Sequence, residues 1–192
     1  MIRRAALASV LLIVLSTASV SAGGSPIVQM QSSSFSPAGL NVVVGETVTW
    51  NNNSGLTHTT TADRFNQWDR TVSNNFQTDV LFARAGNWTY HCEIHAGMTG
   101  KVKVRPTASP SSGTTMTLFF IRAATVNPPT GFVMDIQRRK PGGVFKLWRT
   151  TSGQGASTTL GTAGTWQFRA RTRKTSNDRA TGWGSVLAVV VN

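Results

Sequence analysis

The stretch that decides the fold reads Tyr90-His91-Cys92-Glu93-Ile94-His95-Ala96-Gly97-Met98, and it holds the single cysteine of the 192-residue chain. A further histidine, His58, lies upstream. One thiolate, two imidazoles and one thioether form the ligand set of copper electron-transfer sites, with His₂Cys in a plane and a weak axial Met. Because soft sulfur donors favour Cu(I) and imidazoles also suit Cu(II), this set predicts one copper ion held through a change of oxidation state.

The spacing of these four side chains fits a single site. Cys92 ends a predicted strand, and Gly97 permits the turn that returns Met98 to the same point. His58 is too distant in sequence to share this loop, so it comes from another strand end. Taken singly, such residues usually serve packing or face solvent. Together they predict a metal site made of His58, Cys92, His95 and Met98.

The N-terminal residues have the pattern of an export signal. A basic start precedes an apolar run that is too short to span a bilayer, and small residues follow up to Ala22. We expect residues 1–22 to be a secretory signal peptide and the mature protein to be exported, to a periplasmic or extracellular location. A retained membrane anchor is the weaker alternative, because Ser16 and Thr17 interrupt the run. No other segment is long and apolar enough to cross a membrane.

Charge divides the chain into two parts. Residues 23–106 carry six Lys and Arg against five Asp and Glu, whereas residues 107–192 carry eleven against two. An asymmetry of this size indicates two modules. Between them, residues 107–115 are rich in Pro, Ser and Thr without apolar periodicity, which predicts a linker. We therefore expect one domain over residues 23–106 and a second over residues 116–192.

Both modules have the pattern of β-strands. Residues 40–44 and 47–50 flank a Gly-Glu turn in the first module. Residues 165–171 in the second alternate apolar with polar side chains. Helical spacing of apolar residues is absent from any long window. Short strands separated by Gly, Asn and Pro predict an all-β chain of two sandwiches.

Three motifs in the first module carry a family resemblance. They are Gly45-Glu46-Thr47-Val48-Thr49-Trp50, the three asparagines at 51–53 ahead of His58, and the run from Phe82 to Cys92. Through them, residues 25–105 resemble the cupredoxin family, of the plastocyanin and amicyanin type. The resemblance implies a Greek-key β-sandwich that holds one type 1 copper ion, with the four predicted residues as its ligands. The Cys-x₂-His-x₂-Met loop is similar to the short form of amicyanins.

Other polar residues near the ligands have expected roles. Thr59 stands where many cupredoxins have an asparagine that ties the two ligand loops together, and its hydroxyl can make a similar bridge. Asn53 is expected to support the first ligand loop. His91 alternates with Cys92 along its strand, so its side chain should point away from copper. A solvated side chain is the simpler interpretation of His91. The alternative is that His91 and the exposed edge of His95 form an electron-exchange surface.

Motifs in the second module carry a weaker resemblance. They lie at residues 130–139, 164–171 and 182–185. Through them, residues 116–192 are similar to a fibronectin type III domain, although Trp166 stands where that family usually has tyrosine and the first strand is hard to find. The resemblance implies an immunoglobulin-like β-sandwich that serves as a spacer or a binding surface.

The excess of basic side chains in the second module predicts contact with an anionic surface or an acidic protein. Solvated strand faces are the alternative. Nucleic acid is not expected as a partner, because an exported protein rarely meets it. The candidate contacts lie in two clusters, and they are Arg138, Arg139, Lys140, Arg171, Arg173 and Lys174.

These features predict an exported one-electron carrier that works by outer-sphere transfer, and not an enzyme. Three histidines are too few to bind the additional coppers of a multicopper oxidase. The expected partner is a redox protein that the sequence does not identify. Two alternatives from other classes are a copper-binding or copper-delivery protein and a structural or adhesion module with incidental copper.

Overall fold

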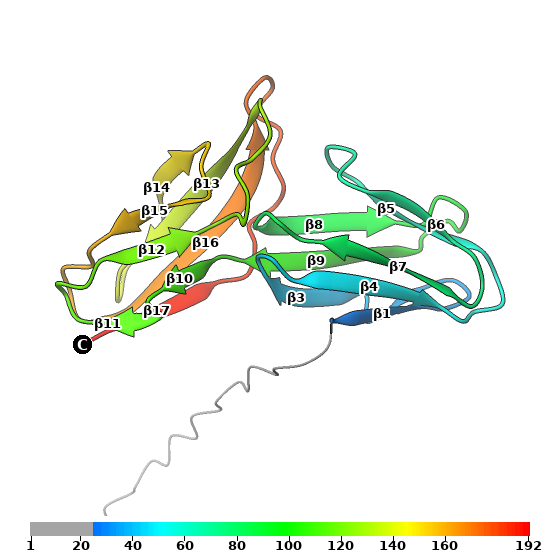
Figure 1. Cartoon of the computed structure of the whole chain (residues 1–192), viewed down its shortest axis with the longest axis horizontal. Coiled ribbons are helices and arrows are strands. Elements are labelled where there is room, and N and C mark those ends of the chain that lie inside the picture. The colour runs from blue at the N-terminus through cyan, green and yellow to red at the C-terminus, as the bar shows by residue number, and fades with distance from the viewer. Residues whose placement is uncertain (1–24) are drawn as a thin grey trace, which may run out of the picture.

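The computed structural model describes residues 25–192, and strands are its only regular elements there. They form two units that lie side by side, each made of two sheets (Figure 1). The prediction of an all-β fold is confirmed for these residues. Within this part of the chain, no helix is long and apolar enough to cross a membrane. The predicted signal peptide, residues 1–22, lies outside the described residues.

The first unit contains strands β1 to β9. Their bounds are Ile27–Met30 (β1), Phe35–Ser36 (β2), Gly39–Val43 (β3), Thr47–Asn52 (β4), His58–Ala62 (β5), Asp69–Val72 (β6), Phe76–Leu81 (β7), Gly86–His91 (β8) and Thr99–Arg105 (β9). One sheet has the order β2-β1-β4-β7 and the other the order β3-β9-β8-β5-β6. β5 and β8 are antiparallel neighbours, and Thr61 and Ala62 at the end of β5 pair with His91 and Tyr90 at the end of β8. The start of β5 therefore lies beside the residues that follow β8.

Aromatic side chains fill the space between these two sheets. Along β8, Trp88 and Tyr90 point inward and are almost fully buried, as the period of two requires. The ring of Trp50 from the opposite sheet meets Tyr90 edge-on, with centroids 5.2 Å apart. Burial of each large apolar side chain contributes about 1.5–3 kcal/mol. This packing fixes the end of β8, directly before Cys92.

The second unit contains strands β10 to β17. Their bounds are Thr107–Ser109 (β10), Ser112–Gly113 (β11), Phe119–Arg122 (β12), Phe132–Arg139 (β13), Lys146–Thr151 (β14), Gly155–Thr158 (β15), Gly164–Lys174 (β16) and Leu187–Val191 (β17). One sheet has the order β10-β12-β15 and the other the order β11-β17-β16-β13-β14. On β16, Trp166, Phe168 and Ala170 are buried while the residues between them are partly exposed, so the predicted alternation is confirmed.

The prediction of a linker over residues 107–115 is wrong. Strand β10 pairs with β12, and β11 pairs in parallel with β17, so this segment is the first strand of the second unit. Pro110 separates the two pieces, since proline cannot donate to a ladder, and the chain passes there from one sheet to the other. The second unit therefore begins at Thr107 and not at residue 116.

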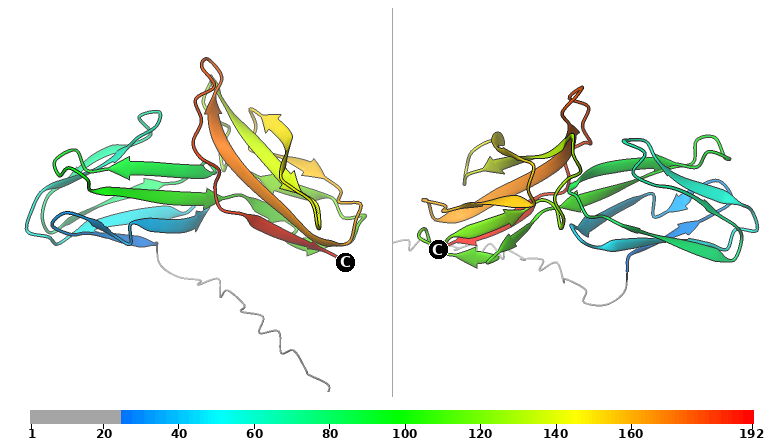
Figure 2. Two further views of the ribbon diagram at one scale, coloured as in Figure 1. Left: turned by 180° about the vertical axis from the view of Figure 1, so that it is seen from behind. Right: turned by 45° about the horizontal axis from the view of Figure 1, so that its top comes forward.

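The two units share a tight interface. Ala85 of the first unit is fully buried among the core residues of the second. Its amide donates to Ala123 O at 2.8 Å, and the amide of Asn87 donates to Gly182 O at the same distance. Viewed from behind, the second unit abuts the end of the sheet where β8 begins (Figure 2). The second unit is thus docked on the first rather than tethered to it.

Gly184 offers a test of this interface. A Cβ atom at Gly184 would overlap the carbonyl oxygen of Val104 and lie 3.1 Å from the amide of Gly86. We expect Gly184→Ala to lower the free energy of unfolding by about 1–3 kcal/mol, because backbone must move to admit the methyl group. Gly161→Ala is the control, since a Cβ there meets nothing within 4 Å. Urea denaturation measures both variants, and equal stabilities would contradict the docked arrangement.

Candidate metal centre

The metal-ligating side chains come from the ends of neighbouring strands. His58 opens β5, and Cys92 follows directly after β8. His95 lies in the loop that leads from β8 to β9. Because both β5 and β9 pair with β8, the sheet itself brings the upstream histidine to the cysteine loop. The structure therefore unites two segments that lie 34 residues apart.

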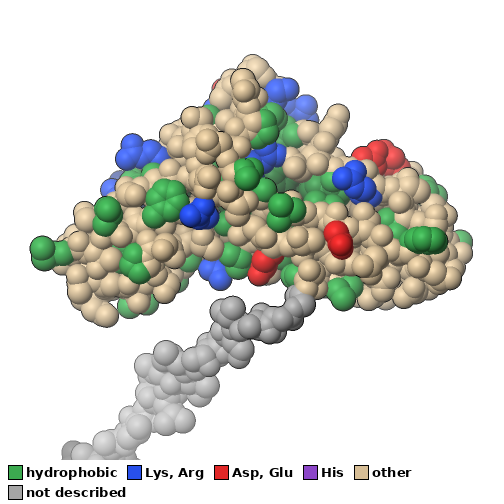
Figure 3. All heavy atoms as spheres, viewed as in Figure 1, with side chains coloured by type: hydrophobic (Ala, Val, Ile, Leu, Met, Phe, Trp, Pro, Cys, Tyr) green, Lys and Arg blue, Asp and Glu red, His purple; other side chains and the backbone are tan. Residues whose placement is uncertain are grey.

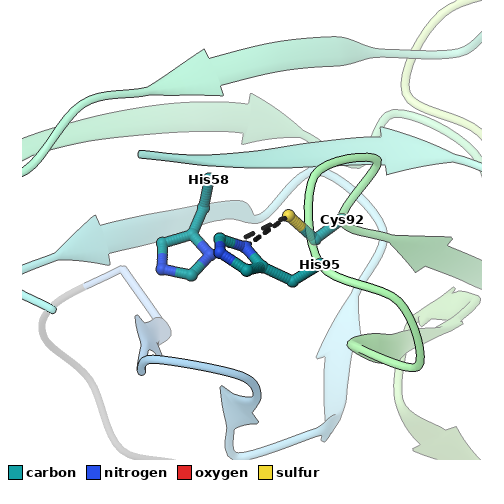
Figure 4. A group of neighbouring side chains, drawn as sticks. All are labelled: His58, Cys92 and His95. Atoms are coloured by element: carbon teal, nitrogen blue, oxygen red, sulfur yellow. Dashed lines mark hydrogen bonds between the residues drawn. The ribbon is translucent and has the colours of Figure 1, made fainter. Parts of the chain in front are cut away.

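The three nearest ligand atoms converge on one point (Figure 4). Cys92 Sγ lies 3.5 Å from His95 Nδ1 and 3.8 Å from His58 Nδ1, and all three atoms lie within 4.8 Å of one another. A trigonal site with metal–sulfur bonds of about 2.3 Å and metal–nitrogen bonds of about 2.0 Å separates sulfur from nitrogen by about 3.7 Å. The donor set and its spacing fit a copper ion.

Burial prepares the ligands in the required form. His58 is fully buried and Cys92 is 4% exposed, whereas His95 is partly exposed. Burial, followed by the nearby His95, lowers the pKa of His58 below its usual value of 6.5. A metal ligand must be the neutral imidazole, so the fold favours the ligating form of His58 before any metal arrives.

Hydrogen bonds close the loop between Cys92 and Met98. The amide of Cys92 donates to Met98 O at 2.9 Å, and the amide of Met98 donates to His95 O at 3.3 Å. Gly97 adopts a φ of +80°, a conformation that glycine reaches without strain. The side chain of Met98 is 1% exposed and packs in the core of the first unit. The loop thus turns back on itself and carries Met98 inward beside Cys92.

Thr59 ties the two ligand segments together. Its hydroxyl accepts a hydrogen bond from the amide of Glu93 at 2.8 Å, and its own amide donates to Cys92 Sγ at 3.3 Å. The side chain is 5% exposed. Threonine therefore makes the bridge expected at this position, and the amide hydrogen bond stabilises negative charge on the sulfur.

Asn53 does not reach the site, because its side chain is exposed. Two residues that sequence reasoning missed support His58 instead. Ser54 Oγ lies 2.9 Å from His58 Nε2, and it donates to Asn52 Oδ1 at 2.8 Å. The fully buried Asn52 in turn donates to Leu56 O and Val72 O, each at 2.8 Å. Since His58 Nδ1 faces the sulfur, its proton belongs on Nε2, and Ser54 holds that tautomer.

His91 lies on the outer face of β8, as its alternation with Cys92 predicts. Its Nδ1 is 2.7 Å from Asp63 Oδ1, and both side chains are roughly two-fifths exposed. His91 is therefore not among the side chains that converge on the sulfur. The imidazole of His91 and the carboxylate of Asp63 therefore lie on the outer face of the sheet, away from the metal-ligating side chains.

The sequence of the first unit matches a known protein family. The family described as copper binding proteins, plastocyanin/azurin family, matches residues 25–105. Residues 25–105 are a cupredoxin domain. Cupredoxins bind one copper ion, and His58, Cys92 and His95 supply three ligands for it here. The domain ends at the border with β10, so the second unit lies outside the match.

Individual relatives cover the same part. The chain is 33% identical over 84 residues to chloroplastic plastocyanin of Tetradesmus obliquus, across 37% of this chain and 58% of that protein. The chain therefore spans less than two thirds of the length of that relative. A reduced Cu(I) amicyanin variant is 29% identical over 44% of this chain and 86% of its own, with a TM-score of 0.39. A purple cupredoxin from Nitrosopumilus maritimus is 22% identical. The match covers 41% of this chain and 98% of that protein, with a TM-score of 0.38.

The basic residues predicted as partner contacts divide into two groups. Arg171 and Arg173 bind within the chain, to the buried carboxylate of Asp135 at 3.1 and 2.9 Å. Arg139 donates to Gln167 and stacks on the ring of Phe145. The other group remains at the surface. Arg138 and Lys140 line a hollow on the second unit, and Lys174 lines another between the two units.

The hydroxyl of Ser54 is open to a direct test. We expect Ser54→Ala to weaken copper binding about 10–100-fold, because His58 Nε2 and Asn52 Oδ1 both lose a partner. Titration against a copper chelator measures the affinity. Ser34→Ala is the control, since that hydroxyl bonds only the exposed Gln31, at 3.1 Å. An unchanged affinity in the Ser54 variant would show that the hydroxyl does not position His58.

Asp135 sets the acid stability of the second unit. Burial would raise its pKa, but hydrogen bonds from Arg173, Thr150 and Arg171 outweigh burial and lower it below 3.8. Asp135 therefore stabilises the fold above pH 3.8, and this contribution is lost as pH falls through the folded pKa. We expect Asp135→Asn to cost about 2–3 kcal/mol near neutral pH, the partial exposure of both arginines reducing the effect.

Denaturation as a function of pH measures this effect. The gap in stability between the parent chain and the Asp135→Asn variant should narrow in acid, because protonation removes the same charge from the parent. Copper binding should stay unchanged, since Asp135 lies on β13 of the second unit. A gap that is constant down to strongly acid pH would refute the role assigned to the carboxylate.

Proposed function

We propose that this protein is an exported one-electron carrier whose copper ion is held by His58, Cys92, His95 and Met98. The observation that carries the proposal is the convergence of one thiol sulfur and two imidazole nitrogens within 4.8 Å, at the end of a cupredoxin domain. When bound, copper supplies a Cu(I)/Cu(II) couple. Met98 enters the proposal as a fourth residue that would hold the ion, because it is buried at the return of the cysteine loop.

The chain's own residues keep the ligands fixed during electron transfer. Ser54 orients His58, Thr59 holds the sulfur, and two backbone hydrogen bonds close the cysteine loop. Ligands that are held by such surrounding hydrogen bonds need little movement when the charge on the metal changes. This arrangement suits outer-sphere transfer, in which no substrate bond is made or broken, and it supports the classification of the protein as a carrier and not an enzyme.

The partly exposed edge of His95 is the proposed surface for electron exchange. Leu56 and Ile94, on the two ligand segments, are 44% and 53% exposed, and they supply apolar surface beside the histidines. A redox partner protein that docks there would approach the metal through His95. His91, with its partner Asp63, is a second candidate surface on the outer face of β8.

The second unit is proposed to be fibronectin type III-like. Its sheet of three strands faces a sheet of five, and its first strand contributes to both through β10 and β11. Such units serve as spacers or binding surfaces, and its basic side chains suit an anionic surface or an acidic protein. We place the mature chain in a periplasmic or extracellular location, on the export pattern of its first residues.

Colour and reduction potential test the copper assignment. The chain loaded with Cu(II) should absorb intensely in the visible, and Cys92→Ser should abolish that band because the thiolate is its donor. Met98→Leu should retain the band and shift the reduction potential. Met116→Leu is the control for the methionine change, because Met116 is 88% exposed and lies in the second unit. A visible band that persists in Cys92→Ser would overturn the assignment.

Kinetics separate a carrier from a copper-delivery protein. A carrier should exchange electrons rapidly and reversibly with small redox reagents while it retains its copper. Stopped-flow absorbance measures the exchange, and a metal count after gel filtration measures retention. Loss of copper to an apo-acceptor protein under the same conditions would favour delivery instead.

A further inference from the structure

A hollow on the second unit lies away from the metal centre. Its volume is about 380 Å³, and it opens beside the turn that joins β13 to β14. This volume is within the range of small-ligand sites, about 300–1,000 Å³. The residues that line it are Arg138, Lys140, Gly143, Val144, Lys146 and Trp166.

The charges around this hollow have one sign. Three of its lining side chains are cations and none is an acid. The sequence has no Asp or Glu between Asp135 and Asp178, a stretch that contains nine Lys and Arg. The ion pairs among the described residues involve Asp63, Asp135 and Asp178, and none of them reaches the three cations of the hollow. In the view of Figure 3, Lys and Arg lie mainly over the second unit.

Aromatic rings hold one of the cations in place. The guanidinium of Arg138 lies 5.6 Å from the ring of Trp148 and 5.7 Å from that of Trp166. The indole of Trp166 is itself fixed, because its Nε1 donates to Thr162 O at 2.8 Å. A stacked guanidinium loses less freedom when it binds an oxyanion, so it suits recognition better than a mobile side chain.

The turn from Lys140 to Val144 forms part of the wall of the hollow. Gly142 adopts a φ of +69°, and the amide of Gly143 donates to Lys140 O at 2.9 Å. A Cβ at Gly143 would lie 2.9 Å from Lys140 Cγ and would displace that side chain. Val144 follows directly and is 69% exposed, so an apolar side chain stands at the rim beside the cations.

We propose that this hollow binds a small organic oxyanion, in which a phosphate or carboxylate group is carried on a ring of sugar size. The oxyanion contacts Arg138, Lys140 and Lys146, which offer charge-assisted hydrogen bonds. The ring packs against Val144 and Trp166. Inorganic phosphate can make only the contacts with the three cations, and an uncharged sugar can make only the contacts with Val144 and Trp166.

The test uses glucose 6-phosphate, inorganic phosphate and glucose as probes of the full chain loaded with Cu(I). Indole N–H resonances of Trp148 and Trp166 in NMR titrations report binding. Glucose 6-phosphate should saturate, bind more tightly than phosphate, and weaken as salt rises. The double variant Lys140→Gln/Lys146→Gln should raise its Kd about tenfold or more. Both lysines are exposed, so the variant should fold.

A matched control removes the same charge elsewhere. Lys101→Gln/Lys103→Gln alters β9 of the first unit and should leave the Kd within about twofold of the parent. Equal losses of affinity for glucose 6-phosphate in the two double variants would show that only net charge matters, and would overturn the proposed site. Equal affinities for phosphate and glucose 6-phosphate would contradict the ring contact. The absence of saturable binding by any probe would overturn the proposal outright.

The proposal does not rest on the copper assignment. The hollow belongs to the second unit, whereas Cys92 lies in the first. The Cys92→Ser chain should therefore bind glucose 6-phosphate as the parent does. Loss of the visible band and loss of anion binding are thus separate results, and each proposal can fail alone.

Discussion

The pairing of β5 with β8 is the constraint on which the metal centre depends, and Thr59 secures it. Thr59 makes two hydrogen bonds from β5 to the residues that follow β8. Its amide donates to Cys92 Sγ, and its hydroxyl accepts from the amide of Glu93. The ligands from these two segments, His58 and Cys92, are buried, which is costly for polar groups unless each has a partner. Ser54 is the partner of His58, and Ser54 is itself held by a hydrogen bond to Asn52. The sheet and its hydrogen bonds therefore organise the site.

The second unit stabilises the first at the opposite end of the same strand. Cys92 follows the last residue of β8, while Ala85 directly precedes its first and is buried in the second unit's core. Backbone hydrogen bonds from Ala85 and Asn87 then join the two units. A strand held at both ends transmits rigidity along its length, since packed interiors resist small displacements. The second unit thus has a physical role in the cupredoxin domain besides any ligand that it binds.

Local patterns predicted the metal ligands because their chemistry is local. Cys92, His95 and Met98 lie in one seven-residue loop, and no other cysteine competes for the role. Asn53 was the wrong asparagine because a strand alternates its faces: Asn52 lies on the inward side of β4, together with Trp50, and Asn53 lies outside. The β10 and β11 strands escaped prediction for another reason. Their ladders are made by backbone groups with partners far along the chain, and Ser, Thr and Gly carry no periodicity that reveals such pairing.

The number of basic residues in the second unit does not predict which of them are available for binding. The second unit has a large excess of Lys and Arg, yet the excess is not one uniform surface. Asp135 pairs with both Arg171 and Arg173, and it does so from a buried position that no count can reveal. The cations at the β13–β14 turn have no such acid, and Arg138 lies against the rings of Trp148 and Trp166. The basic residues that the sequence places in two similar clusters therefore differ in role: one group pairs with an acid inside the sheet, and the other is available to a ligand. The distinction follows from where one carboxylate lies, and it narrows the expected contacts on β16 while leaving those at the turn.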